Sequence, residues 1–128
     1  MTQTDMKTAA SCHCGAVTLE AQSLPTTLTE CTCSICRRYG AQWAYYKMRE
    51  VVITGAEGAQ TSYSWGDHDI EFFWCTTCGC LTHYEDIEKD ADGRIAINGQ
   101  MLPREVTAMI PVRTFDGRSE GASCRERV

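Results

Sequence analysis

Short stretches of alternating apolar and polar residues recur along this chain and predict strands rather than long helices. The first covers residues 16–21, and the threonine-rich segment 24–30 is expected to pair with it. Further strands are predicted at residues 43–47, 51–54, 61–65, 70–74, 81–84, 94–98 and 111–115, with a turn at 66–68. Many short strands at close spacing indicate an all-β domain.

Two segments depart from the strand pattern. Residues 34–39 predict about one helical turn, capped by Ser34 and closed by Gly40. Residues 102–109 predict one or two turns of helix after Pro103.

The length of 128 residues allows one domain. We expect residues 1–10 to be a flexible tail, residues 11–117 to form the folded domain, and residues 118–128 to be a second tail. The chain is 43% hydrophobic, which argues against a wholly disordered protein.

Charge and hydropathy exclude several partners. The formal net charge of −5 provides no overall field to attract nucleic acid or an anionic membrane. No apolar run approaches the roughly 20 residues that cross a bilayer, and the first residues lack a secretory leader pattern. We therefore expect a cytoplasmic protein that binds neither nucleic acid nor membrane.

Nine cysteines change this picture. An odd count without a leader argues against a disulfide framework, so metal binding is the first hypothesis. Eight of the nine fall into three clusters, C-x-C at 12–14, C-x-C-x-x-C at 31–36 and C-x-x-C-x-C at 75–80, while Cys124 stands alone.

A structural zinc site needs four ligands, most simply two pairs of cysteines. Cys12 and Cys14 with Cys75 and Cys78 meet this need. The remaining triple, Cys31, Cys33 and Cys36, leaves a fourth position for water or substrate, as in a catalytic zinc site, unless Cys80 completes it. Iron–sulfur binding competes with zinc, but the spacing does not reproduce the usual ferredoxin runs.

Three segments carry a resemblance to a known family: CHCGAV at 12–17, CTCSICR at 31–37 and FWCTTCG at 73–79. With Ile97-Asn98 and residues 112–117, they resemble the glutathione-dependent formaldehyde-activating enzyme family, which also contains centromere protein V-type domains. The resemblance spans about residues 11–117.

The resemblance implies a β-tent fold of short antiparallel strands held together by zinc. It implies a structural zinc on Cys12, Cys14, Cys75 and Cys78, and a second, labile zinc on Cys31, Cys33 and Cys36 next to the thiol of glutathione. The implied activity is that of a carbon–sulfur lyase that adds glutathione to formaldehyde and gives S-hydroxymethylglutathione. Cys80 departs from the family pattern.

Basic and aromatic residues offer candidate substrate contacts. Arg37 and Arg38 follow the cysteine triple, and guanidinium groups bind carboxylates in a bidentate manner, although both side chains would also fit a solvated surface. The tryptophans and tyrosines on predicted strands either line a pocket or fill the core. His83 is either a proton shuttle or a structural histidine bonded to the backbone.

Three classes of function remain open. The first is a zinc-dependent lyase acting on glutathione or a related thiol and a small aldehyde. The second is a non-catalytic zinc module that mediates protein contacts, and the third is a metal- or redox-responsive cysteine protein. Zinc stoichiometry and lability distinguish the enzyme from the module.

Overall fold

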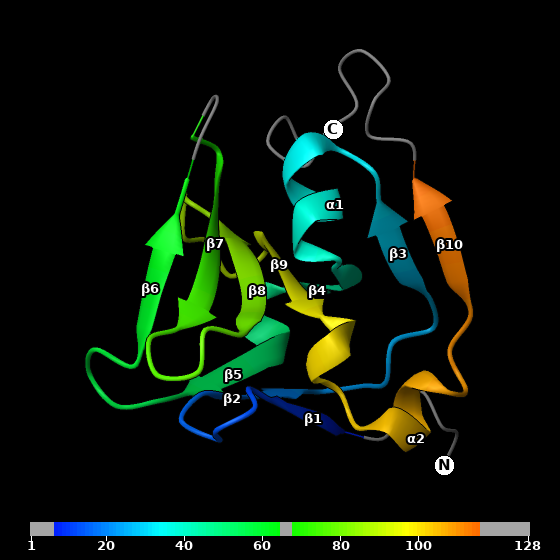
Figure 1. Cartoon of the computed structure of the whole chain (residues 1–128), viewed down its shortest axis with the longest axis horizontal. Coiled ribbons are helices and arrows are strands. Elements are labelled where there is room, and N and C mark those ends of the chain that lie inside the picture. The colour runs from blue at the N-terminus through cyan, green and yellow to red at the C-terminus, as the bar shows by residue number, and fades with distance from the viewer. Residues whose placement is uncertain (1–6, 65–67, 116–128) are drawn as a thin grey trace.

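The computed structural model describes residues 7–64 and 68–115. The strands are β1 (Thr8–Ser11), β2 (Thr18–Ala21), β3 (Leu28–Cys31), β4 (Gln42–Lys47), β5 (Val51–Thr54), β6 (Gln60–Tyr63), β7 (Ile70–Cys75), β8 (Leu81–Asp86), β9 (Arg94–Asn98) and β10 (Val112–Phe115). The helices are α1 (Ser34–Tyr39) and α2 (Arg104–Thr107), with single 3-10 turns at Met48–Glu50 and Gly99–Met101 (Figure 1).

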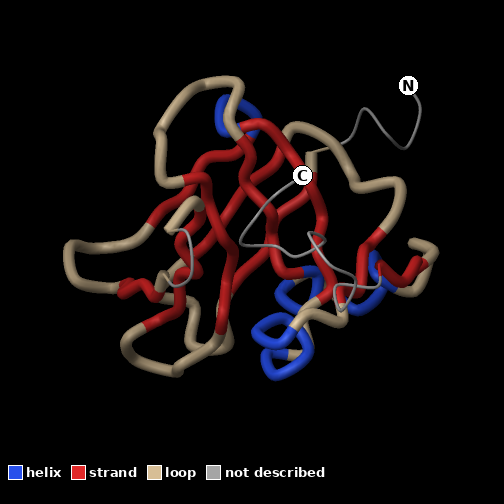
Figure 2. Tube along the Cα trace, turned by 90° about the horizontal axis from the view of Figure 1, so that it is seen from above, coloured by secondary structure: helices blue, strands red, loops and turns tan. Residues whose placement is uncertain are grey.

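The strands form two sheets. One sheet has the order β1-β2-β5, and the other has the order β10-β3-β4-β9-β8-β7-β6. Viewed from above, the strands fill the centre of the trace, and loops and the short helices lie at its periphery (Figure 2). The predicted mostly-β class is therefore confirmed, with one exception to the antiparallel rule, because β10 pairs with β3 in parallel.

Several local predictions need correction. The predicted N-terminal tail of residues 1–10 is wrong for Thr8–Ala10, which form β1 together with Ser11 and pair with β2. The segment 24–30 does not pair with the strand before it: β3 begins at Leu28 and lies between β4 and β10. Both errors concern which strand a segment pairs with. The alternation of apolar and polar residues within a segment does not encode its partner.

Some predictions lie outside the described residues. These are the end of the strand predicted at 61–65, most of the turn at 66–68, Cys124 and the tail predicted at 118–128.

The seven-stranded sheet separates two hydrophobic clusters. On β9, Ile95 and Ile97 pack in one cluster, whereas Ala96 between them packs in the other. Trp43 and Ala44 divide in the same way on β4. Because successive side chains of a strand point to opposite faces, the sheet has an apolar core on each side.

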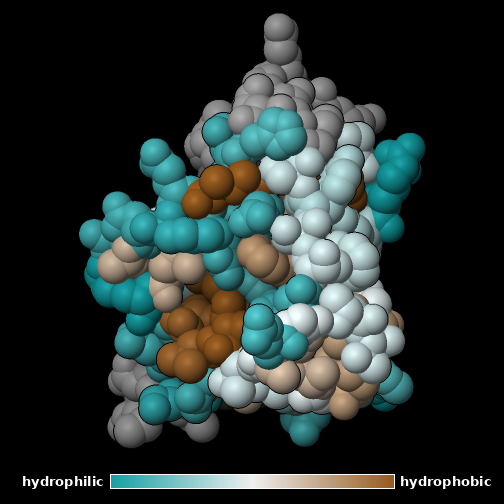
Figure 3. Space-filling view, turned by 90° about the vertical axis from the view of Figure 1, so that its left-hand side faces the viewer, coloured by the Kyte–Doolittle hydropathy of each residue, from teal (hydrophilic) through white to brown (hydrophobic). Residues whose placement is uncertain are grey.

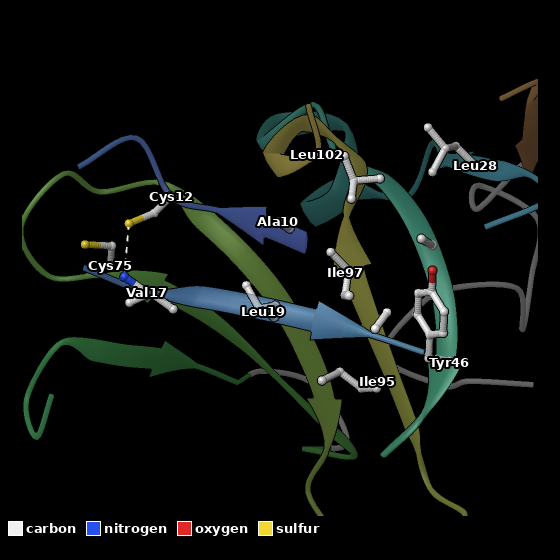
Figure 4. Packing of buried hydrophobic residues seen from close by; sticks show 12 residues of the cluster. Ala10, Cys12, Val17, Leu19, Leu28, Tyr46, Cys75, Ile95, Ile97 and Leu102 are labelled. Carbon is white, nitrogen blue, oxygen red and sulfur yellow. Dashed lines mark hydrogen bonds between the residues drawn. The ribbon is translucent and has the colours of Figure 1, made fainter. Parts of the chain in front are cut away.

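The three-stranded sheet covers the first of these cores. Leu19 on β2 lies in the same cluster as Ile95 and Ile97, with the sulfur atoms of Cys12 and Cys75 at one end (Figure 4). The second core contains Trp43, and there the cysteine triple packs with aromatic rings. On the side of the molecule that carries β6, hydrophobic residues reach the surface only in patches among polar ones (Figure 3).

The N-cap of helix α1 lies one residue before the predicted one. Cys33 is the N-cap, and its Sγ accepts a hydrogen bond from the backbone N–H of Cys36 at 3.5 Å. Gly40 closes the helix with φ 67°, the left-handed conformation that glycine adopts without strain, as predicted.

Within the described residues, no helix has the length and apolar character needed to cross a membrane.

Candidate metal centres and the adjoining pocket

Four cysteines from two distant turns converge at one end of the first core. Cys12 and Cys14 lie between β1 and β2, and Cys75 and Cys78 lie at the end of β7 and in the turn to β8. The Sγ–Sγ distance is 3.7 Å from Cys12 to Cys14 and 3.6 Å from Cys14 to Cys75. A tetrahedron with Zn–S bonds of about 2.3 Å has edges of about 3.8 Å. The four thiols therefore fit a zinc ion.

Backbone hydrogen bonds shape both turns around the sulfur atoms. The N–H of Val17 donates to Sγ of Cys12 at 3.3 Å, and the N–H groups of Thr77 and Cys78 donate to Sγ of Cys75 at 3.3 and 3.4 Å. Such donors stabilise the thiolate form, which is the form that binds metal.

The electrostatics favour a thiolate at two members of this group but not at Cys14. A backbone hydrogen bond from Ala16 lowers the pKa of Cys14, but burial and hydrogen bonds with the neighbouring cysteines outweigh it and raise the pKa to about 11. Hydrogen bonds from the backbone of Cys80 and Cys14 lower the pKa of the Cys78 thiol to about 5, despite the opposing effect of burial. The pKa of Cys75 is also lowered, first by a backbone hydrogen bond from Cys78. Cys75 and Cys78 therefore favour the anionic form in which a thiol binds metal.

The cysteine triple is assembled from one strand end and one helix. Cys31 ends β3, Cys33 caps α1 and Cys36 lies within that helix. Their ligand atoms lie within 4.8 Å of one another, and the residues are 1%, 3% and 0% exposed. Three thiol groups so close together also fit a zinc ion, which would take its fourth ligand from elsewhere.

Trp43 contacts this triple directly. Its indole N–H donates to Sγ of Cys36 at 3.3 Å, and Trp43 is fully buried. The strand pattern allows Trp43 either a core or a pocket position. The structure places it in the core, as a hydrogen-bond donor to a candidate metal ligand.

Cys80 does not complete the triple. Its backbone oxygen accepts from the N–H of Cys75 at 3.0 Å, and its side chain packs in the first core beside Cys78. A contact with Cys78 and burial raise the pKa of Cys80, against the effect of a backbone hydrogen bond from His13. Cys80 therefore lies next to the four-cysteine group but belongs to neither set of converging thiols.

No disulfide bond links the eight cysteines that the structure describes. The two groups are thus available as thiols.

A pocket of about 560 Å³ is lined in part by residues that lie close in sequence to cysteines of both groups. The described residues that line it come from α1, β6, β7, β8 and the turn between the last two strands: Arg38, Tyr39, Tyr63, Trp74, Gly79 and Leu81. Leu81 packs in the same core cluster as the cysteine triple, and Gly79 follows Cys78. The buried triple itself is not among these lining residues.

The two candidate arginines differ in position. Arg38 lines the pocket, and its guanidinium donates to the backbone oxygen of Ser34 at 2.8 Å. Both side chains are exposed, but Arg37 is not among the described lining residues.

His83 has side-chain partners rather than backbone partners. Its Nδ1 lies 2.8 Å from Oγ1 of Thr82, and its Nε2 lies 2.8 Å from Oε2 of Glu85. The ring is fully buried and stacks on Phe73 with the ring centroids 4.7 Å apart. The pairing of His83 with Glu85 was not predicted, although residues two apart on a strand lie on the same face.

Comparisons with known proteins agree with the geometry. A sequence model of the family described as glutathione-dependent formaldehyde-activating enzyme matches residues 7–114. The chain is also similar to a Rhodobacter sphaeroides protein of known crystal structure, with a TM-score of 0.66 and 26% identity. That match covers 82% of this chain and 99% of the other.

Proposed function

Because the chain belongs to the glutathione-dependent formaldehyde-activating enzyme family, we propose that it is a zinc-dependent carbon–sulfur lyase of this type. It adds glutathione or a related thiol to formaldehyde or another small aldehyde, and the product with formaldehyde is S-hydroxymethylglutathione. The cytoplasm suits this role, because its reducing conditions keep the cysteine groups as thiols.

The observation that carries the proposal is that the chain brings together two separate groups of thiols, one of four and one of three. A pocket lined by their neighbours in sequence offers room for a substrate. We assign the four-cysteine group to a structural zinc and the triple to a second zinc with one ligand position left for substrate. A zinc ion held by the triple would supply Lewis acidity that favours a thiolate or polarises a carbonyl oxygen.

The chain's own residues bind and orient the reactants. Arg38 lines the pocket and offers a guanidinium to a substrate carboxylate. Tyr39 and Trp74 line the same pocket and offer apolar surface to the substrate. Arg37 points to no described pocket wall, so we leave it outside the proposed site.

The reaction itself makes modest demands on the protein. The substrate sulfur bonds to the carbonyl carbon, the C=O π bond breaks, and the proton of the thiol ends on the former carbonyl oxygen. Since this addition needs no redox step, holding thiol and aldehyde together supplies much of the expected acceleration.

Cys33→Ser tests the proposal selectively. Serine is itself a favoured N-cap, so this variant keeps an acceptor for the Cys36 N–H while it removes one thiol of the triple. We expect one zinc per chain to be lost, with cooperative unfolding retained. The rate of adduct formation, followed by NMR exchange with ¹³C-formaldehyde and glutathione, should fall to the uncatalysed rate.

Cys80→Ser is the matched control, because it removes a thiol outside both groups. It should keep both zinc ions and the wild-type rate. A Cys33→Ser protein that loses zinc but retains full activity would contradict the proposal.

A non-catalytic zinc module is the second candidate. The near-complete burial of Cys31, Cys33 and Cys36 favours it, since structural zinc sites are closed. In that case both ions would resist chelation equally, glutathione would show no calorimetric binding signal, and adduct formation would proceed at the uncatalysed rate.

A further inference from the structure

The pocket beside the cysteine triple is lined mainly by rings. Tyr39 comes from α1, Tyr63 from β6 and Trp74 from β7, and Leu81 adds an aliphatic side chain. The ring of Tyr39 packs against the ring of Phe72, with the ring centroids 5.5 Å apart. Rings held in this way offer flat apolar surfaces that favour a flat apolar ligand.

The tyrosine ring on the helix stays uncharged in this setting. Burial raises the pKa of Tyr39, and the neighbouring Tyr63 and Cys36 add to the rise. Tyr39 lies three residues after Cys36 on α1, packs against the core cluster that contains the triple, and lines the pocket together with Tyr63. A ligand that rests on Tyr39 is therefore near the proposed reaction site.

Charge in the pocket is sparse. Arg38 is the one charged side chain among the described lining residues. Its hydrogen bond to the Ser34 oxygen, one helical turn back, holds the guanidinium along α1 and leaves other N–H groups for a ligand. One guanidinium matches one carboxylate.

We propose that this pocket takes a substrate with a flat, apolar group, preferably an aromatic ring, and a single carboxylate at its far end. The ring lies between Tyr39, Tyr63 and Trp74, and the carboxylate pairs with Arg38. This inference rests on the proposed function and narrows its substrate class. Glutathione fits this lining less well, because it has two carboxylates and an ammonium group but no apolar body.

The aromatic acid can be either of the two reactants. It is either the thiol, which then adds to a small aldehyde, or the aldehyde, to which glutathione then adds. In both cases the same bonds change: sulfur bonds to the carbonyl carbon and the thiol proton ends on its oxygen. The pocket chemistry is shared, and the reaction assay distinguishes the two sources.

Binding is measured first, on the zinc-loaded protein and without turnover. The probes are 3-phenylpropanoate, propanoate, which lacks the ring, and 3-phenylpropan-1-ol, which lacks the charge. Calorimetry gives affinities, and the indole N–H resonance of Trp74 reports the place of binding. We expect 3-phenylpropanoate to bind about tenfold more tightly than either other probe, the effect of one charged contact or one buried ring.

Variants separate the two contacts. Arg38→Gln should weaken 3-phenylpropanoate about tenfold and leave the alcohol unchanged. Arg37→Gln is the matched control, with the same change one residue away, and should alter neither affinity. Tyr63→Ser, on the exposed end of β6, should weaken both ring-bearing probes. Equal binding of propanoate and 3-phenylpropanoate, or equal effects of the two arginine variants, would overturn the inference.

Turnover assays then identify whether the thiol or the aldehyde carries the aromatic ring. One reaction pairs 4-(sulfanylmethyl)benzoate with formaldehyde, a second pairs glutathione with 4-(2-oxoethyl)benzoate, and a third pairs glutathione with formaldehyde. We expect the protein to accelerate one of the first two reactions more than the third, each relative to its own uncatalysed rate. If only the third is accelerated, this inference is wrong and the proposed function stands. If none is accelerated, the proposed function fails and the inference falls with it.

Discussion

The indole N–H of Trp43 donates to Sγ of Cys36 across 3.3 Å, in a part of the core where both residues are fully buried. The contact joins the middle of the seven-stranded sheet to the helix that carries two thiols of the triple. A hydrogen bond of this kind spreads the negative charge of a ligating thiolate and orients it.

Trp43→Phe keeps an aromatic ring in the core but removes this donor. Outer-sphere partners of metal ligands contribute about 10–100-fold in affinity, so zinc on the triple should be lost to a chelator at a correspondingly lower chelator concentration. The smaller ring should also lower the free energy of unfolding by about 1–3 kcal/mol. Chelator competition followed by elemental analysis measures the first effect.

The four-cysteine group serves as the internal control for Trp43→Phe, because it lies in the other core cluster. Its zinc should be retained as in the wild type. Equal weakening of both sites would indicate general destabilisation rather than a lost hydrogen bond.

Cys78→Ser should remove the structural zinc and with it much of the stability. The four-cysteine group ties the β1–β2 turn to the β7–β8 turn, and a structural zinc site contributes directly to the free energy of folding. We expect a large fall in Tm and loss of one zinc per chain. Cys80→Ser, two residues away, should show neither change, and a zinc loss there would place Cys80 among the ligands.

The Glu85 carboxylate should make the free energy of unfolding depend on pH in the acid range. Burial alone would raise its pKa, but hydrogen bonds from His83 and Lys89 lower the pKa below the ordinary glutamate value. Since the folded pKa is below the unfolded one, of about 4.3, the stabilisation is complete above that pH and is lost as pH falls through the folded pKa.

Glu85→Gln tests this pH dependence. The variant should be less stable than the wild type by about 1–3 kcal/mol at pH 7 and equally so at pH 6, with the difference shrinking below about pH 4.3. Urea unfolding of both proteins at each pH gives the difference directly. A difference that does not change with pH would show that packing, not charge, explains the effect.

Gly40→Ala should destabilise α1 through the backbone alone. A Cβ at this position would meet no heavy atom within 4 Å, but the residue has φ 67°, which costs other residues about 1–2 kcal/mol. The loss should appear in thermal unfolding, and amide exchange within α1 should accelerate. Gly55→Ala is a useful comparison, because its backbone is not left-handed while a Cβ would lie 3.3 Å from the Ala16 oxygen.

The two groups of converging thiols could be predicted from the sequence. The spacing of Cys12 with Cys14 and of Cys75 with Cys78 predicted one group of converging thiols, and the three cysteines at 31–36 predicted another. This succeeded because thiolates close in sequence need only a tight turn to share an ion, and turns are encoded locally. Strand positions were also predictable, since alternation with period two reflects a buried and an exposed face.

Tertiary structure alone decided which elements meet. The partners of β3, the placement of β5 in a different sheet from β4, and the parallel contact of β10 with β3 depend on packing between distant segments. The same packing placed Cys80 beside the four-cysteine group, put Arg38 but not Arg37 on the wall of the pocket, and gave His83 a carboxylate partner. The local pattern of a strand predicts which of its faces is buried. Which other element that face contacts depends on the free energy of burying apolar surface throughout the chain.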